Sequence, residues 1–290
     1  MAGKMRTKVG QSGISLTEMT VVVAAVAILV SLSAPAVRTF FDSLGSGDST
    51  KAMISASLSA ARAIAAKEQR YAGIRFQKAW HPLGPLYGRQ YMIFIINDFE
   101  RTGLASGFRA VEGIKPIKLP EDIGVMDFTI VTDRDLGTIT NYSEVRLDDP
   151  LLANRDDWIN EDSELTDTTT FSIIFSPSGK MVIHGVRIRN RDGTPRWPLF
   201  LDNSNDDVFN TITRITDPLN PAGMFVQDDY WDPNNLGLGP ELSRSGFVIY
   251  EKGKFQQALN RGLPYSDYLW QLVPQAIYIN PYTGRMISTD

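Results

Sequence analysis

The chain has 290 residues, of which 43% are hydrophobic and 21% charged, and its 33 acidic and 29 basic residues give a formal net charge of -4. The acidic balance argues against a general nucleic-acid binder, because such proteins neutralise phosphates with clustered lysine and arginine. The absence of cysteine excludes disulfides and thiolate metal sites, so the stability of a chain this long must come from its core.

The N-terminal segment combines a basic start with a long apolar run. Residues Met19–Val37 are free of charge, and this length is close to the roughly 20 residues that a membrane-spanning helix needs. The basic residues Lys4, Arg6 and Lys8 precede the run and predict that the N-terminus stays cytoplasmic. One carboxylate, Glu18, stands at the start of the run, where a charge is costly and requires a partner.

Four positions in this region carry a resemblance to a known signal. Gly13, Ile14, Glu18 and Pro35 have the spacing of the class III signal of type IV pilins and type II secretion pseudopilins, although Ile14 stands where that family usually has phenylalanine. The resemblance implies that prepilin peptidase, an aspartic protease, cuts between Gly13 and Ile14 and methylates the new amine of Ile14. It also implies that Glu18 pairs with the N-terminal amine of a neighbouring subunit during filament assembly.

Two other interpretations of the apolar run remain open. The run could be a simple membrane anchor, since its length is sufficient for one. It could also be a secretory signal, cut at the small residues Ala34–Ala36 to release a soluble domain that starts at Val37. Both interpretations leave Glu18 without a role.

A second helix is expected after the apolar run. Glycines in Gly45–Ser49 interrupt the helical pattern and predict a flexible joint. From Thr50 to Arg70, small and apolar residues recur at helical spacing and predict one buried face: Ile54, Leu58, Ala61 and Ala65. The expected parts are a cytoplasmic leader (1–13), a transmembrane and filament-core half-helix (14–42), an amphipathic half-helix (43–70) and a β-rich globular domain (71–290).

Beyond Tyr71 the pattern changes to short β-branched and aromatic runs separated by turn residues. The predicted strands lie at Tyr91–Ile96, Phe128–Thr132, Phe171–Phe175, Val182–Ile188, Phe247–Tyr250 and Ala276–Ile279. The clearest turn, Ser176–Gly179, predicts a hairpin. A helix followed by strands indicates an α+β fold, with the helix packed on an antiparallel sheet or sandwich.

Three further segments resemble GspH/FimT-type minor pseudopilins when taken in chain order. They are Ala60–Ile64 in the second helix, Ile174–Lys180 around a proline-glycine turn, and Ile279–Met286 with its glycine-arginine pair. The resemblance implies a pilin-like fold with a long N-terminal spine helix. The chain is longer than that family's compact domain, and the excess predicts long insertions at Leu83–Thr170 and Arg189–Gln275.

The expected insertions are acidic. Between Asp148 and Asp167 there are eight carboxylates and one arginine. The run Asp202–Asp207, with Asp202, Asp206 and Asp207 as candidate calcium ligands, places oxygen atoms at alternate positions as calcium loops do. It lacks the glycine and the distal glutamate of an EF-hand loop, so a solvated turn is the favoured interpretation. The carboxylates and aromatics that follow Asp228 form either a contact surface or a loop anchored on the core.

No motif for catalysis is found. His81 and His184 are the only histidines, and neither lies in a metalloprotease motif, while no serine-hydrolase elbow is present. The pair Gly179-Lys180 is followed by Met181, so the Walker pattern fails, and Gly237–Gly239 fails the dinucleotide pattern. We therefore expect a protein that is not an enzyme and that needs no cofactor, unless the aspartates bind calcium.

The sequence predicts a minor pseudopilin or pilin-like subunit of a type II secretion pseudopilus or type IV pilus. Its expected partners are prepilin peptidase, other pilins, the inner-membrane assembly platform and membrane lipid. The expected localisation is the bacterial inner membrane, crossed once, with a periplasmic globular domain. One alternative is a surface-exposed pilin-like protein that holds a ligand, a secreted substrate or calcium. Another is a membrane-anchored enzyme.

Overall fold

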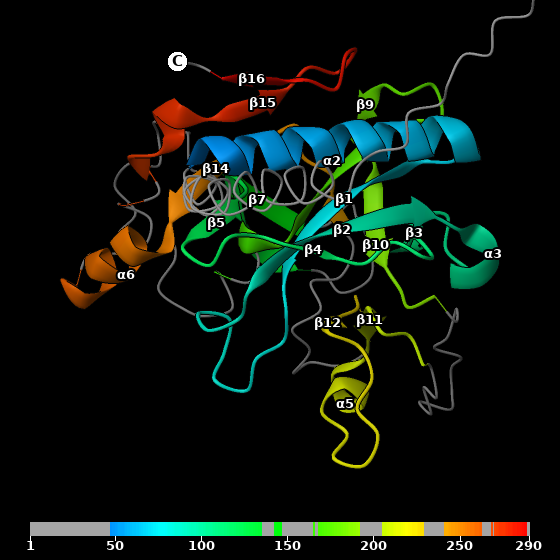
Figure 1. Ribbon diagram of the computed structural model, residues 1–290, viewed down its shortest axis with the longest axis horizontal. Coiled ribbons are helices and arrows are strands. Elements are labelled where there is room, and N and C mark those ends of the chain that lie inside the picture. Colours follow the sequence, from blue (N-terminus) through cyan, green and yellow to red (C-terminus); the bar gives the residue numbers. More distant parts are fainter. Residues whose placement is uncertain are drawn as a thin grey trace, which may run out of the picture. The chain divides into compact units, whose positions relative to one another are not determined.

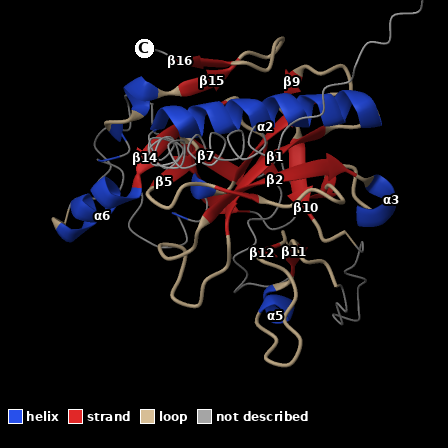
Figure 2. Cartoon of the chain, viewed as in Figure 1, coloured by secondary structure: helices blue, strands red, loops and turns tan. Residues whose placement is uncertain are grey.

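We describe the protein from a computed structural model, in which residues 47–134, 142–146, 165, 168–191, 205–228, 241–262, 268 and 270–288 are described. The chain divides into two units, Met1–Ser46 and Gly47–Asp290. The description below concerns the second unit. Its helices and strands are drawn in Figures 1 and 2.

One 22-residue helix, α2 (Gly47–Glu68), lies on the sheet. The predicted apolar stripe is confirmed, because Ile54, Leu58, Ala61 and Ala65 are all fully buried in one core cluster. The small residues of the stripe let the helix backbone approach the strands closely, and the helix packs mainly on β1 (Ala72–Lys78). The predicted joint is wrong for Gly47–Ser49, which are already helical, while Gly45 lies outside the described residues.

The main sheet has eight strands. Its order is β13 (Glu241–Leu242), β10 (Gly185–Ile188), β3 (Gly107–Ala110), β2 (Gln90–Asn97), β1, β8 (Phe171–Phe175) and β9 (Met181–Val182), and β4 (Ile117–Lys118) also pairs with β2. Most neighbours are antiparallel, but β10 and β3 run parallel, with Arg187 opposite Gly107. The sheet is therefore mixed.

The other strands form smaller sheets. A four-stranded sheet has the order β16 (Met286–Ser288), β15 (Ile277–Ile279), β14 (Gly246–Glu251) and β5 (Ile123–Met126). Two pairs complete the strands: β6 (Thr129–Arg134) with β7 (Tyr142–Arg146), and β11 (Phe209–Asn210) with β12 (Phe225–Val226). The short helices are α3 (Phe99–Thr102), α5 (Ile212–Ile215), α6 (Lys252–Asn260) and the 3-10 helix η2 (Val273–Gln275).

One buried side chain links the two larger sheets. The Gln90 amide accepts a hydrogen bond from the Val125 nitrogen at 2.8 Å and donates to the Val125 oxygen at 2.8 Å and the Thr169 oxygen at 2.7 Å. It thus pairs with β5 as a peptide group would, because its amide offers both a donor and an acceptor. The link joins β2 to the edge of the four-stranded sheet in a curled, half-barrel arrangement.

Both faces of the central strand β2 are buried. Met92, Phe94 and Ile96 belong to the core under α2, whereas Ile93 and Ile95 belong to a second core that includes Phe209 and Phe225. Successive residues of a strand point to opposite faces, so a strand covered on both sides needs a continuous apolar sequence. This requirement explains the unbroken run Tyr91–Ile96.

The predicted fold class is wrong. We expected an α+β pilin-like fold with a long spine helix on an antiparallel sheet or sandwich, but the described residues are mostly β, and their main sheet is mixed and curled. Three of the four described α-helices have only 4 to 9 residues. The order of the main sheet, including its parallel pair, depends on pairings between strands far apart in sequence, which leave no local pattern. The expected half-helix 14–42 lies outside the described residues.

The predicted inner-membrane localisation is corrected as well. Among the described residues, none of the helices combines the length and the apolar character needed to cross a membrane. The apolar run Met19–Val37, on which that prediction rested, lies outside the described residues.

All six predicted strand runs contain strands. The two segments expected to be insertions, however, are integral parts of the sheets. The run Val182–Ile188 is divided between β9 and β10, with His184 at the break. The first expected insertion, Leu83–Thr170, contains the central strand β2 and its neighbours β3 and β4. The second, Arg189–Gln275, contains β13 and β14. These segments build the sheets and are not additions to a finished domain.

Candidate functional site

The three segments of the minor-pseudopilin resemblance meet at one side chain, Arg62. Its Nε donates to the Gly179 oxygen at 2.7 Å, its Nη1 to the Thr283 oxygen at 2.7 Å and its Nη2 to the Tyr282 oxygen at 3.4 Å. The planar guanidinium presents several donors in fixed directions, so one residue of α2 can hold two separate turns. We call these contacts the Arg62 junction. Figure 1 shows β9 and the β15–β16 hairpin beside α2.

The first turn of the junction joins β8 to β9. Gly179 has a φ of 75°, and its N–H donates to the Ser176 oxygen at 2.8 Å. A positive φ is readily adopted only by glycine, so the hairpin predicted at Ser176–Gly179 is confirmed together with its physical reason. A Cβ at Gly179 would lie 3.1 Å from the Arg62 Nε. Glycine therefore also leaves room for the guanidinium.

The second turn joins β15 to β16. Asn280 accepts hydrogen bonds at its Oδ1 from the nitrogens of Tyr282 and Thr283, at 2.9 and 3.0 Å. Asparagine commonly stabilises a turn in this way, and it orients the two carbonyls that Arg62 binds. Gly284 has a φ of 68°, and a Cβ there would lie 3.0 Å from the Phe175 ring. The glycine thus allows the turn to approach β8.

The two turns also contact each other directly. The Met181 nitrogen donates to the Pro281 oxygen at 2.8 Å. The Lys180 ammonium lies 5.6 Å from the centre of the Tyr282 ring, within the range of a cation–π contact. Tyr282 itself is 69% exposed. In the Arg62 junction, the arginine binds the backbone carbonyls of the two turns, while Lys180 and Tyr282 give the turns a basic and aromatic outer surface.

A second polar cluster lies on the other face of β1. Arg75 is fully buried, and its guanidinium binds Glu241 at 2.9 Å, Asp228 at 3.1 Å and the Gln77 side-chain oxygen at 2.7 Å. Ser172 also donates to Glu241 at 2.9 Å. We call this set the Arg75 cluster. Buried charges persist only when they are paired and hydrogen-bonded, as these are.

The cluster changes the proton affinity of one carboxyl. Burial raises the pKa of Glu241 to about 7, and although the Arg75 charge opposes this rise, the Asp228 charge adds to it. Asp228 is held in place by its own contacts, since its Oδ2 accepts from the Ile188 nitrogen at 2.7 Å. This part of the predicted loop after Asp228 is therefore anchored on the core, whereas residues 229–235 lie outside the described residues.

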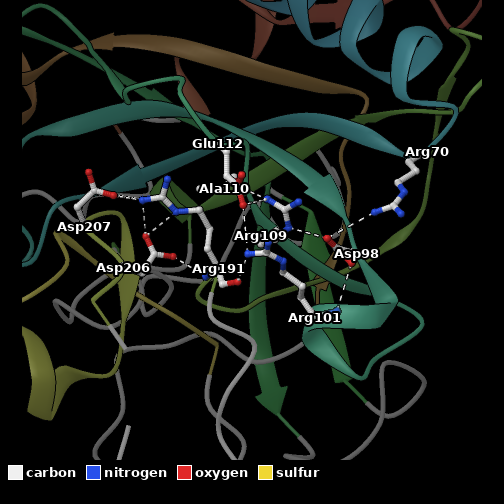
Figure 3. Close-up of polar contacts among 9 residues, drawn as sticks. All are labelled: Arg70, Asp98, Arg101, Arg109, Ala110, Glu112, Arg191, Asp206 and Asp207. Atoms are coloured by element: carbon white, nitrogen blue, oxygen red, sulfur yellow. Dashed lines mark hydrogen bonds and ion pairs between the residues drawn. The ribbon is translucent and has the colours of Figure 1, made fainter. Parts of the chain in front are cut away.

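A third group of charges, drawn in Figure 3, lies along β3. Asp98 accepts from the Arg101 nitrogen at the start of α3, binds the Arg109 Nε at 2.7 Å and lies 3.4 Å from Arg70. Burial alone would raise the pKa of Asp98, but the hydrogen bonds from Arg109 and Arg101 and the charges of Arg109 and Arg70 outweigh it and lower the pKa. The Arg101 side chain also donates to the Arg191 oxygen at 3.1 Å.

The calcium candidates Asp206 and Asp207 belong to this group. The Arg191 guanidinium binds both side chains, and its Nη2 lies 2.8 Å from the Asp206 Oδ1. The Val208 nitrogen donates a hydrogen bond to the same Asp206 oxygen at 2.9 Å. The carboxylates are thus engaged by a cation and a backbone donor, as in a structural turn. The third candidate, Asp202, lies outside the described residues. Among those described, no group of three or more acidic or histidine side chains could hold a metal ion.

The structure does not describe the processing and assembly residues predicted from the sequence. Gly13, Ile14, Glu18 and Pro35 all lie outside the described residues. Of the two histidines, His184 contacts the rings of Tyr71 and Phe108 at centroid distances of 4.3 and 5.7 Å. His81 stacks on Tyr87 at 5.7 Å. These contacts fit a packing role for both histidines.

The sequence analysis did not single out the Arg75 cluster. Its one local signal is an arginine between Ile74 and Phe76 in a short apolar run, because such a charge needs a buried partner. The partners themselves come from positions far along the chain. In the comparisons with known proteins, no family model, no curated protein and no solved structure matches this chain.

Proposed function

We propose that this chain is a minor pilin-like subunit that prepilin peptidase cuts between Gly13 and Ile14, and that then assembles with other subunits into a type II secretion pseudopilus or a type IV pilus. The observation that carries the proposal is the segment from Gly13 to Glu18, in which a glycine is followed by an apolar residue and then by a single carboxylate. The Arg62 junction supports it, because the three segments of the minor-pseudopilin resemblance are in contact there.

The proposal gives Glu18 a physical role. A carboxylate at the start of an apolar run is unfavourable unless a cation compensates it. Cutting after Gly13 creates such a cation, the N-terminal amine of Ile14. In an assembled filament this amine pairs with Glu18 of the neighbouring subunit, so the pair selects both a processed chain and a defined stagger between subunits.

The processing step is tested on the full chain produced with and without prepilin peptidase. We expect the mature protein to start at methylated Ile14 only when the peptidase is present, as measured by intact mass and terminal sequencing. Gly13→Val should block the cut, because the β-branched side chain stands at the scissile bond, whereas Gly10→Val in the same leader should not. A protein that still starts at Met1 in the presence of the peptidase, or that starts at Val37, contradicts the proposal.

The assembly step is tested with Glu18→Gln, which removes the charge and keeps the size of the side chain. We expect this variant to be cut normally but to be lost from isolated filaments. The matched control is Glu68→Gln at the exposed end of α2, where the carboxylate pairs with Lys67. Incorporation of the Glu18→Gln variant at the level of the control would refute the role of Glu18.

A further inference from the structure

The three segments that meet at the Arg62 junction carry only basic charge in their sequences. Segments Leu58–Ala66, Ser176–Gly185 and Asn280–Ser288 contain Arg62, Lys180 and Arg285 but no aspartate or glutamate. Arg62 is satisfied by carbonyl oxygens. Among the ion pairs of the described residues, neither Lys180 nor Arg285 takes part, although other exposed cations of the chain do: Lys67, Arg89 and Lys254.

Apolar side chains lie among these charges. Tyr282 is 69% exposed under the Lys180 ammonium, and Ile287 is 48% exposed. Met286 packs against the core, so its neighbours Arg285 and Ile287 lie on the opposite, outer side of the extended chain. We call Lys180, Tyr282, Arg285 and Ile287 the basic corner. Exposed aromatic residues beside arginine or lysine are typical of protein interfaces.

We propose that the basic corner binds the acid-rich segment Asp148–Asp167 of a second copy of this chain. The inference rests on the proposed function, since it names one contact between subunits of the filament. The segment supplies eight carboxylates against one arginine, which complement the cations of the corner. The corner and the segment are different parts of the chain, so their contact can be formed head-to-tail and repeat along a filament, as the proposed function requires.

An acidic peptide fits the corner better than a polyanion such as nucleic acid or an anionic membrane. The chain as a whole has a net charge of -4, which repels an extended negative surface. The corner is small, and it offers Tyr282 and Ile287 for apolar contact, which a peptide chain can use. Its charges therefore select a short acidic segment.

The test uses the processed full chain and measures self-association by sedimentation velocity at roughly 50 and 500 mM salt. The double variant Lys180→Glu with Arg285→Glu should weaken association at low salt by about tenfold or more, because attractive contacts become repulsive. The matched control, Lys115→Glu with Arg261→Glu, makes the same charge change at exposed cations elsewhere and should leave association unchanged. Mixing the corner variant with a chain carrying Asp156→Lys and Asp157→Lys should restore association.

Three results would overturn the proposal. In the first, the corner variant associates as strongly as the control. In the second, the mixed charge-reversed chains fail to restore association, so the occupant is not the acidic segment. In the third, the wild-type chain binds anionic vesicles through the corner without associating with itself. Cleavage at Gly13 is measured in every sample, so that failure of processing in the wild type counts against the proposed function and not against the corner.

Discussion

Replacing Glu241 with glutamine should remove a defined part of the pH dependence of stability. In the Arg75 cluster, Glu241 accepts hydrogen bonds from Arg75 and Ser172 at one oxygen, Oε1. Glutamine keeps an oxygen for these two donors and removes the charge. The Glu241→Gln variant therefore resembles the wild-type protein with Glu241 protonated.

The sign follows from the raised pKa. Glu241 has a pKa of about 7 in the folded protein and of 4.5 without the contacts of the fold. Between pH 4.5 and 7 the folded state therefore binds the proton more tightly than the unfolded state does. The stabilisation is fully present below about pH 4.5 and is lost as the pH rises through about 7. Each pH unit is worth at most about 1.4 kcal/mol, so the free energy of unfolding should decrease by about 3 kcal/mol across the window.

Urea unfolding of the full chain between pH 5 and 8, followed by tryptophan fluorescence, measures this effect. The variant should lie within about 1 kcal/mol of the wild type near pH 5 and exceed its free energy of unfolding by about 3 kcal/mol at pH 8, because it never buries the second negative charge. The control, Glu251→Gln, removes an exposed carboxylate paired with Lys254 and should leave the pH profile unchanged. Parallel wild-type and Glu241→Gln profiles over this range would refute the reasoning.

Three further substitutions test other contacts. Asp98→Asn should lower the free energy of unfolding by roughly 1–3 kcal/mol at pH 7. Because the pKa of Asp98 is lowered in the folded protein, this difference should disappear as acid protonates the wild-type carboxylate below its ordinary pKa of 3.8. Equal stability of the two proteins at pH 7 would exclude a stabilising role for the Asp98 charge. Arg62→Ala should lower the free energy of unfolding by roughly 2 kcal/mol, which corresponds to a decrease of about 4–8 °C in Tm by calorimetry. The control Lys67→Ala, on the exposed side of α2, should change the Tm little. Equal Tm changes in the two variants would contradict a stabilising role of the Arg62 junction. Gly73→Ala should lower the free energy of unfolding by more than about 4 kcal/mol in urea, because its Cβ would overlap the backbone oxygen of Ile173. Gly253→Ala in α6 meets nothing within 4 Å and should be neutral or stabilising by up to about 1 kcal/mol. A tolerated Gly73→Ala would count against the close strand spacing.

The sequence predicts those elements whose pattern is local. The helix stripe of α2 and the strand run Tyr91–Ile96 are read correctly, because burial on one or both faces leaves a periodic or continuous apolar signal. Strand β1, which lies between β2 and β8, was missed. It carries Arg75, Gln77 and Lys78, which look like surface residues until distant partners are known.

Those partners explain why the rest could not be predicted. Asp228 and Glu241 are separated from Arg75 by 153 and 166 positions, so no spacing rule relates them. The parallel pairing of β10 with β3 also joins distant parts of the sequence, residues 185–188 and 107–110, so no local pattern predicts it. The predicted antiparallel sheet failed for this reason, and the segments taken for insertions supply strands of the sheets. All three segments of the Arg62 junction are named by the sequence resemblance, but no pattern in them indicates that Arg62 binds carbonyl oxygens of the other two.

The Arg62 junction joins α2 to two turns, whereas the Arg75 cluster lies on the face of β1 that is turned away from α2, so their energies should add. Ile74 and Phe76 belong to the core under α2, while Arg75, which alternates with them, points to the other face. The two arginines share no hydrogen-bond partner. We expect the double variant Arg62→Ala with Glu241→Gln to differ from the sum of the single variants by less than about 0.5 kcal/mol at pH 8. A larger deviation would show that the two groups of contacts are energetically coupled.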